Sequence, residues 1–263
     1  MTQLSVNVNK VATLRNTRNI GIPSVVRLAR IALDAGAAGI TIHPRPDERH
    51  IRRSDVDELA ALLREFPDRE LNIEGNPFHG LIEHCLRVRP HQATLVPDSV
   101  DAPTSDRGWQ LLALSPEEER HLRAAIAQLR DAGCRVSLFV DPIPEVVRVA
   151  AELGAARVEL YTEPYARAHA RGRADAVLAR YREAAHAATA VGLEVNAGHD
   201  LNLHNLGLFL AEVPNVAEVS IGHALIADAL EFGMAETVRR YLALCRRAPR
   251  HGEAIPPTGT AAR

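Results

Sequence analysis

The chain has 263 residues, of which 46% are hydrophobic and 24% are charged, and its net charge at pH 7 is −2. This length allows one large domain or two small ones with a full hydrophobic core. The near-neutral charge argues against a nucleic-acid partner, and the lack of a signal peptide or an apolar run of about 20 residues argues against a membrane partner. Three dispersed cysteines without CxxC spacing predict reduced packing residues in a cytoplasmic protein.

Short β-branched and aliphatic runs alternate with amphipathic helical patterns, such as those at 25–35 and 56–65. The predicted strands cover residues 4–9, 39–43, 70–74, 92–97, 135–141, 157–162, 194–199 and 218–222. Eight strand–helix units with nearly continuous apolar strands predict an α/β fold, a parallel (β/α)8 TIM barrel with extra helices, formed by residues 1–247 as a single domain. A doubly wound open sheet is the alternative, but the Gly-rich dinucleotide turn expected after its first strand is absent.

Helix ends carry their own signals. Ser54 with Asp57, and Ser115 with Glu118, have the spacing of N-terminal caps. Glycines at positions 36, 133, 154 and 192 each follow a helical pattern, where a left-handed residue closes a helix.

Two segments are longer than the minimal strand–helix unit. Residues 99–114 contain the only tryptophan, and residues 165–181 form an arginine- and alanine-rich helical extension. Such insertions predict lids or subunit contacts. Residues 248–263 are predicted to form a disordered C-terminal tail.

In a barrel of this kind, side chains at the carboxyl ends of the strands converge on one site. A single histidine at a strand end is commonly just a hydrogen-bonded polar residue, whereas several proton-transferring groups on different strands indicate a functional site. The groups at the predicted strand ends are Asn7, Asn9, Lys10, His43, Arg45, Glu74, Asp98, Asp141, Glu159, Thr162, Asn196, His199, Gly222 and His223.

These residue types favour acid–base chemistry. Glu74 follows an apolar strand, so burial would raise its pKa toward neutrality and make it a general base. The alternative for Glu74 is a structural ion pair with an arginine. His43 and His199 titrate near physiological pH and can exchange protons with a substrate amine, carbonyl or hydroxyl.

The same ends also favour anion binding. Arg45, Arg49 and His50 form a cationic loop stiffened by two prolines, although a solvated charge run would have the same composition. Gly222 leads from a strand into a helix whose first amides can hold a phosphate. Lys10 is the only lysine of the chain, which favours a functional positive charge over an ordinary surface lysine.

Seven segments, in this order and spacing, resemble pyridoxine 5′-phosphate synthase across all eight predicted strands. They are VNVNKVATLRNTR, TIHPRPDERHI, NIEGN, VSLFVD, VELYT, VNAGHDLN and SIGHALI. The resemblance implies a (β/α)8 barrel that assembles as a homo-octamer and uses no metal or organic cofactor. It also implies condensation of 1-deoxy-D-xylulose 5-phosphate with 3-amino-2-oxopropyl phosphate, which closes the pyridine ring of vitamin B6 and releases phosphate and water.

The resemblance also implies roles for single residues. The family's acid–base groups fall on His43, Glu74 and His199, with an auxiliary carboxylate at Glu159. Binding of the amino-ketone phosphate falls on Asn7, Arg18, Asp200, Gly222 and His223. Binding of the deoxyxylulose phosphate falls on Asn9, Lys10, Arg45, His50 and Thr104.

Two positions depart from the family pattern. Many members have Asp-His where this chain has Asn9 and Lys10, and a glycine is often found where this chain has Asp200. Lys10 can bind phosphate, but it cannot transfer a proton as a neutral imidazole does. A backbone contact at Asp200 must accommodate a side chain. A Schiff base between Lys10 and a substrate is a further alternative.

Two other functions are compatible with this fold. The first is a metal-dependent TIM-barrel hydrolase or isomerase acting on a sugar phosphate, although no HxH or HxxE pair is present. Its ligands would be His43, Glu74, Glu159 and His199. The second is a non-catalytic binder of a phosphorylated metabolite, but a binder has no need of three proton-transferring groups.

Overall fold

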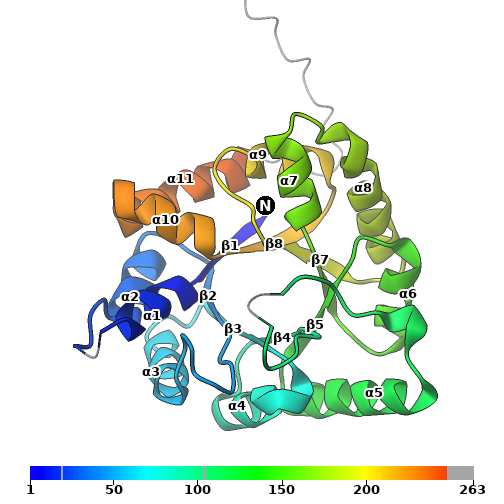
Figure 1. Cartoon of the computed structure of the whole chain (residues 1–263), viewed down its shortest axis with the longest axis horizontal. Coiled ribbons are helices and arrows are strands. Elements are labelled where there is room, and N and C mark those ends of the chain that lie inside the picture. The colour runs from blue at the N-terminus through cyan, green and yellow to red at the C-terminus, as the bar shows by residue number, and fades with distance from the viewer. Residues whose placement is uncertain (19, 103–104, 248–263) are drawn as a thin grey trace, which may run out of the picture.

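Eight parallel strands close into a barrel in chain order, with β8 pairing back to β1 (Figure 1). The computed structural model describes residues 1–18, 20–102 and 105–247. The predicted (β/α)8 barrel is therefore confirmed. Its strands are β1 (Gln3–Asn7), β2 (Gly39–Ile42), β3 (Glu70–Gly75), β4 (Gln92–Leu95), β5 (Arg135–Val140), β6 (Arg157–Leu160), β7 (Glu194–Ala197) and β8 (Val216–Ile221).

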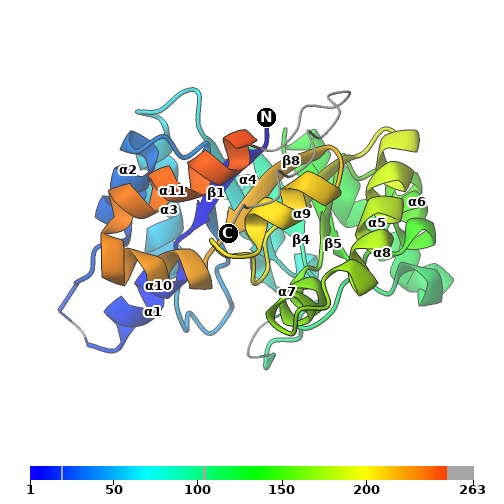
Figure 2. The same cartoon turned by 90° about the horizontal axis from the view of Figure 1, so that it is seen from above.

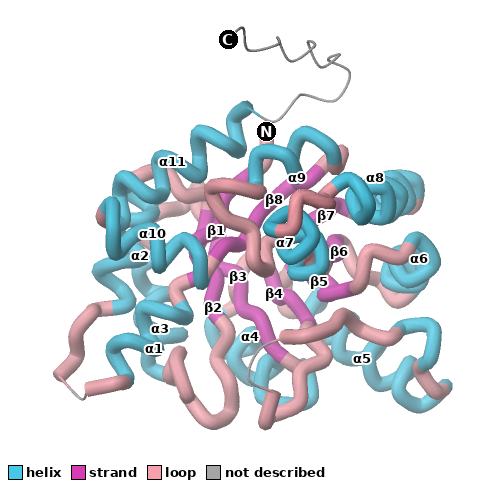
Figure 3. The backbone as a smooth tube through the Cα atoms, turned by 45° about the horizontal axis from the view of Figure 1, so that its top comes forward, coloured by secondary structure: helices cyan, strands magenta, loops and turns pink. Residues whose placement is uncertain are grey.

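Helices surround the outside of the barrel (Figure 3). Among the described helices, none combines the length and the apolar character that crossing a bilayer requires. A kinked turn (Pro77–Leu81), in which His79 and Gly80 leave the helical conformation, precedes α4, and a 3-10 turn (Leu111–Ala113) precedes α5. The helices are α1 (Asn9–Asn16), α2 (Val25–Asp34), α3 (Arg53–Leu63), α4 (Ile82–Val88), α5 (Pro116–Asp131), α6 (Pro144–Glu152), α7 (Glu163–Ala170), α8 (Asp175–Ala190), α9 (Leu206–Glu212), α10 (His223–Phe232) and α11 (Met234–Arg247).

The main hydrophobic core lies between the outer face of the strands and the helices. Leu4 and Val6 of β1 and Ile40 and Ile42 of β2 are fully buried in it. Because side chains alternate along a strand, each second residue points into the barrel instead. Burial of one such aliphatic side chain stabilises the fold by about 1.5–3 kcal/mol.

The inner face of the barrel is polar. Ser5 and Thr41 bring their hydroxyl oxygens to 2.7 Å, and the Thr94 hydroxyl donates to Asn72 Oδ1 at 3.0 Å. These four side chains come from β1 to β4 and are all buried. Barrel interiors are usually filled by branched aliphatic side chains, so this interior is built for polar groups.

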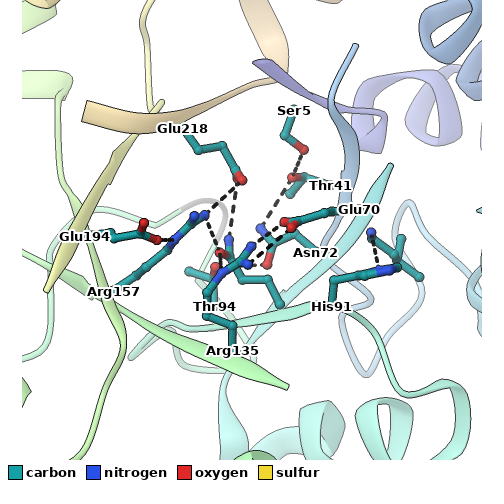
Figure 4. Close-up of polar contacts among 12 residues, drawn as sticks. Ser5, Thr41, Glu70, Asn72, His91, Thr94, Arg135, Arg157, Glu194 and Glu218 are labelled. Carbon is teal, nitrogen blue, oxygen red and sulfur yellow. Dashed lines mark hydrogen bonds and ion pairs between the residues drawn. The ribbon is translucent and has the colours of Figure 1, made fainter. Parts of the chain in front are cut away.

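Charged side chains fill the amino-terminal end of the barrel (Figure 4). Arg157 donates to Glu194 at 2.6 Å and to Glu218 at 3.2 Å, and Arg135 pairs with Glu70. Each arginine is thus paired with a glutamate from another strand of the barrel. Figure 2 shows α1 and α7 at one end of the barrel and the N-terminus at the other. Because the chain passes directly from β1 into α1, the end near α1 holds the carboxyl ends of the strands.

The first strand ends two residues earlier than predicted. Val8 has φ −95° and ψ 11°, which leaves the extended region, and its carbonyl accepts the amide of Ala12 at 3.2 Å. Asn9 and Lys10 therefore open α1 and do not end a strand. Val8, Val11 and Ala12 have the spacing of a helix. Over so short a segment, this spacing cannot be told apart from the alternation of a strand. Most other strands also end one or two residues early.

Helix α3 begins at Arg53, so the predicted cap at Ser54 with Asp57 is wrong. The residue before the helix is Arg52, and the Asp55 carboxylate accepts its backbone N–H at 2.7 Å. Asp55 also pairs with a buried guanidinium of α1. This long-range pairing gives no signal in the local sequence of α3.

The other predicted helix ends are confirmed. The Ser115 hydroxyl accepts the Glu118 amide at 3.3 Å, and the Glu118 carboxylate accepts the Ser115 amide at 2.8 Å. The four glycines that follow helices have positive φ values of 108°, 90°, 97° and 77°. They are Gly36, Gly133, Gly154 and Gly192.

The two long insertions pack against the barrel. The Trp109 indole N–H donates to the Leu95 carbonyl, and the Trp109 amide donates to the Phe139 carbonyl, both at 2.9 Å. The second insertion forms α7 and the start of α8, with Tyr165 and Tyr181 buried. Their roles as lids or subunit contacts stay predictions, and the predicted tail at 248–263 lies outside the described residues.

We expect Gly198→Ala to lower the free energy of unfolding by about 2 kcal/mol or more, because the added Cβ would lie 1.9 Å from the Ser220 carbonyl oxygen. Gly207→Ala in α9 is the control, since its Cβ would meet only the Leu244 side chain at 3.6 Å. There the alanine should stabilise the helix by roughly 0.5–1 kcal/mol. Urea unfolding measures both variants, and equal stabilities would contradict the close approach at Gly198.

Candidate active site

The carboxyl ends of the strands surround a cavity of about 560 Å³. Most of the residues predicted for the site line this single cavity, although they lie up to 216 positions apart in the chain. The predicted residues that line it are Asn7, Asn9, Lys10, His43, Arg45, His50, Glu74, Glu159, His199, Asp200, Gly222 and His223.

Two residues with a predicted binding role, Arg18 and Thr104, are not among the lining residues, and neither are the strand-end residues Asp98, Asp141, Thr162 and Asn196. Arg18 is exposed in the turn after α1 and does not line the cavity. Thr104 lies outside the described residues.

The cavity also has lining residues that sequence reasoning missed, among them Ser105, Phe139 and Ser220. Phe139 pairs in register with Glu159 on the neighbouring strand. The alternation of side chains along its strand could therefore have predicted that Phe139 points into the barrel. Ser105 belongs to an insertion, for which no periodicity exists.

Two carboxyl groups in the cavity are held in an environment that disfavours their charge. Burial, followed by repulsion from the Glu159 carboxylate, raises the pKa of Glu74 well above its usual value. Burial, followed by repulsion from Glu218, raises the pKa of Glu159 to about 8. The Oε2 atom of Glu159 has no hydrogen-bond partner among the described residues. Both groups can therefore hold a proton near neutral pH.

The predicted alternative for Glu74, an ion pair with arginine, is wrong for the described residues, where no ion pair includes Glu74. Its hydrogen bond comes instead from Asn7 Nδ2 at 3.4 Å. Asn7 Oδ1 accepts the Asn9 amide at 3.0 Å, and Asn9 Oδ1 accepts the His43 amide at 2.9 Å. A continuous set of hydrogen bonds thus positions Glu74 relative to the backbone of His43.

The histidines of the β2 loop are kept neutral. Burial and then the charge of Arg45 lower the pKa of His43 well below its usual value. Burial, then the charge of Arg45 and then the charge of Lys10 lower the pKa of His50 to about 4. His50 Nδ1 accepts the Ile51 amide at 2.9 Å, so the neutral ring carries its proton on Nε2. Neutral rings are able to accept a proton from a substrate at pH 7.

The β2 loop is cationic as predicted, but its arginines are partly neutralised. Arg45 donates to the buried Asp98 carboxylate at 2.5 Å, and the Ser105 hydroxyl donates to the same carboxylate at 2.8 Å. Arg49 donates to the carbonyls of Val100 and Ala102, each at 2.8 Å. These bonds connect residues 98–102 and Ser105 to the β2 loop.

Two helix N-termini face the cavity without acidic residues in their first turns. Lys10 lies in the first turn of α1 and makes no ion pair within the described residues. Gly222 precedes α10, and a Cβ there would lie 3.1 Å from side-chain atoms of Asn7. Positive charge is unfavourable at a helix N-terminus unless an anion offsets it. The cavity is therefore lined by two helix ends suited to anions, both next to Asn7.

His199 is held from several sides where β7 ends. The Thr162 hydroxyl donates to its carbonyl at 2.6 Å, and Tyr161 contacts its ring edge-on with centroids 5.3 Å apart. Its Nδ1 lies 3.1 Å from Asp200 Oδ2. The ring therefore has a defined position in the cavity that the two carboxyl groups also line.

The family model described as pyridoxal phosphate biosynthesis protein PdxJ matches residues 4–247. The chain belongs to the PdxJ family. A relative from Albidiferax ferrireducens, named pyridoxine 5′-phosphate synthase, is 57% identical over 248 residues, covering 92% of this chain and 96% of the relative. A relative of the same name from Chelativorans sp. is 53% identical over 247 residues, covering 92% of this chain and 98% of the relative.

Solved structures outside the PdxJ family share the barrel at low sequence identity. A 3-keto-L-gulonate-6-phosphate decarboxylase from Vibrio cholerae gives a TM-score of 0.62 at 11% identity, covering 94% of this chain and 99% of that one. A thiamine phosphate pyrophosphorylase from Pyrococcus furiosus gives 0.59 at 14% identity, covering 94% and 96%. At these identities the likeness shows the fold alone.

In the described part of this PdxJ-family chain, no three His, Cys, Asp or Glu side chains are grouped as a metal site requires. His43, Glu74, Glu159 and His199 line one cavity, yet they do not form such a group. The metal-dependent alternative therefore finds no ligand set in these residues.

We expect Glu159→Gln to stabilise the protein relative to wild type at pH 8 and to have little effect at pH 5. In the unfolded chain this carboxyl ionises near the ordinary glutamate pKa of 4.5, whereas in the folded protein it keeps its proton up to about pH 8. Within this window the unfolded state binds fewer protons, so wild type loses stability as pH rises, by on the order of 5 kcal/mol in total. Urea midpoints at both pH values measure this, and a difference independent of pH would refute it.

Proposed function

We propose that this member of the PdxJ family is a pyridoxine 5′-phosphate synthase. It condenses 1-deoxy-D-xylulose 5-phosphate with 3-amino-2-oxopropyl phosphate and releases phosphate and water. The observation that carries this proposal is one cavity with carboxyls of raised pKa, histidines of lowered pKa and two anion-favouring ends. This combination suits two phosphorylated substrates that must exchange protons with the protein several times.

The acid–base roles fall on four lining residues. The substrate amine and ketone first join as a Schiff base, which releases water. Glu74 then removes a proton from the joined substrates as general base, and His43 and His199 move the protons that accompany loss of water and phosphate. Glu159, protonated at neutral pH, adds an auxiliary acid. Holding both substrates in one cavity makes the final ring closure intramolecular.

The phosphates bind at the two anion-favouring ends. Lys10, in the first turn of α1, and His50, in the β2 loop, hold the deoxyxylulose phosphate together with Arg45 and Asn9. Gly222 and His223, at the first turn of α10, hold the amino-ketone phosphate together with Asn7. Lys10 supplies a full charge, whereas Arg45 shares its charge with a buried carboxylate. The resemblance alone supports Arg18 and Thr104 as further ligands.

The finer features of the protein follow from the same family membership. We propose one catalytic domain over residues 1–247, because the family model ends at 247. We further propose a cytoplasmic homo-octamer that needs no cofactor and has no nucleic-acid or membrane partner. Analytical ultracentrifugation tests the octamer, and a sedimenting monomer would refute it.

The direct test mixes chelator-treated protein with both phosphate substrates and follows pyridoxine 5′-phosphate absorbance and phosphate release. We expect both signals without added metal. Product that forms only after a divalent ion is restored would refute the metal-free mechanism and favour a metal site at the His/Glu cluster. No product under either condition would refute the proposed activity.

We expect Glu74→Gln to lower turnover by roughly 10²-fold or more, the scale of general-base catalysis, while the fold and phosphate binding persist. Steady-state kinetics and circular dichroism measure these properties. The control is Glu83→Gln, which removes an exposed carboxylate paired with Arg53 outside this cavity and should leave turnover unchanged. Turnover near wild type in Glu74→Gln would exclude Glu74 from the mechanism.

We expect Lys10→Ala to raise the Michaelis constant for 1-deoxy-D-xylulose 5-phosphate roughly tenfold, because a charge-assisted bond to phosphate is lost. The Michaelis constant for the amino ketone should change little. Arg27→Ala, on the exposed face of α2, removes a positive charge of the same sign as a control. Loss of turnover with trapping of substrate on wild-type Lys10 by borohydride would instead indicate the Schiff-base alternative.

A further inference from the structure

Asp200 has a backbone conformation that residues other than glycine rarely adopt. Its φ is +64°, in the left-handed region, where aspartate and asparagine are tolerated better than most side chains. Asn205 Nδ2 donates to the Asp200 carbonyl at 3.1 Å, and Asn202 Nδ2 donates to it at 3.4 Å. The conformation is therefore stabilised by the loop, and a glycine would adopt it with less strain.

The side chain at this position contacts the ring of His199. Asp200 Oδ2 lies 3.1 Å from His199 Nδ1, and this hydrogen bond is the first cause that lowers the pKa of Asp200. An ionised carboxylate only accepts hydrogen bonds, so Nδ1 must be the donor. The neutral ring then carries its proton on Nδ1 and presents Nε2 as the acceptor. With the carbonyl of His199 bound by Thr162, both the backbone and the ring are oriented.

The same carboxylate is badly suited to bind a phosphate. The positive charge of His223 is a further cause that lowers the pKa of Asp200, so the two groups lie close enough to interact. A phosphate bound at His223 and the first turn of α10 would repel the Asp200 carboxylate. A direct ligand role for this side chain therefore conflicts with its charge, whereas the family resemblance implies only a backbone contact at this position.

We propose that Asp200 is a positioning residue for His199, an inference that rests on the proposed function. Its carboxylate fixes the ring orientation and the Nδ1–H tautomer. It also stabilises the imidazolium that forms when Nε2 takes a proton from the substrate, a role known for carboxylates paired with catalytic histidines. The proton returns to the substrate or to water from Nε2, and Asp200 itself stays ionised.

Two variants separate positioning from phosphate binding. Asp200→Gly keeps the left-handed backbone and removes the acceptor, so we expect kcat to fall roughly tenfold while the Michaelis constant for 3-amino-2-oxopropyl phosphate stays unchanged or falls. Asp200→Asn keeps an acceptor oxygen and tolerates the same φ, so we expect it to rescue most of kcat. An increased Michaelis constant with unchanged kcat in Asp200→Gly would refute positioning and indicate phosphate binding. No change in either constant would also refute it.

Arg89→Gly is the matched control for the backbone. Arg89 has φ +50°, is exposed at the end of α4 and does not line the cavity. Both glycine variants should unfold at a higher temperature than wild type, but only Asp200→Gly should lose kcat. An equal loss of kcat in both would show that backbone relaxation, and not the carboxylate, matters.

A readout without catalysis separates this inference from the proposed function. The ring ¹⁵N chemical shifts of His199, assigned with a His199→Gln variant, report which nitrogen carries the proton. We expect Nδ1–H in wild type and a tautomer mixture in Asp200→Gly. Wild type that forms no product would refute the proposed function, whereas an unchanged tautomer in Asp200→Gly would refute the role of Asp200.

Discussion

The chemistry of this protein depends on carboxyl groups that are buried in the barrel without a cation beside them. Glu74 and Glu159 lie where desolvation and repulsion from neighbouring carboxylates disfavour ionisation, and the pKa of Glu159 rises to about 8. An arginine in contact with either group would lower its pKa and remove its ability to carry a proton at pH 7. The position of each positive charge around the cavity is therefore as important as the position of the acids.

The arrangement of the arginines satisfies this constraint. Arg45 pairs with Asp98 at the carboxyl end of the barrel, and Arg157 pairs with Glu218 at the amino-terminal end. Both arginines are thus occupied by acids other than the two that carry protons. Positive potential for the substrates comes instead from two helix N-termini and from Lys10. Proton transfer and anion binding can then coexist in one cavity.

Sequence reasoning succeeded where the signal was local and periodic, and it failed where a distant partner decided the outcome. The capping box at Ser115 depends on a residue three positions away, and it is present as predicted. The start of α3 depends on Asp55, which a guanidinium of α1 draws inward, and it was predicted wrongly. Most strand ends were placed one or two residues late, because the point at which pairing with the neighbouring strand stops is decided by that neighbour and not by the local sequence.

The sequence by itself determined the barrel, its strand order and most of the residues that line the cavity, because alternation, helical period and strand-end position are properties of neighbouring residues. Only the tertiary structure decided which of those residues interact. Asn9 joins a helix and positions His43, Arg45 shares its charge with Asp98, and Arg18 lies outside the cavity. These outcomes depend on burial and on distances between segments far apart in the chain. A linear sequence does not state such distances, because they arise only when the eight strands close on one another.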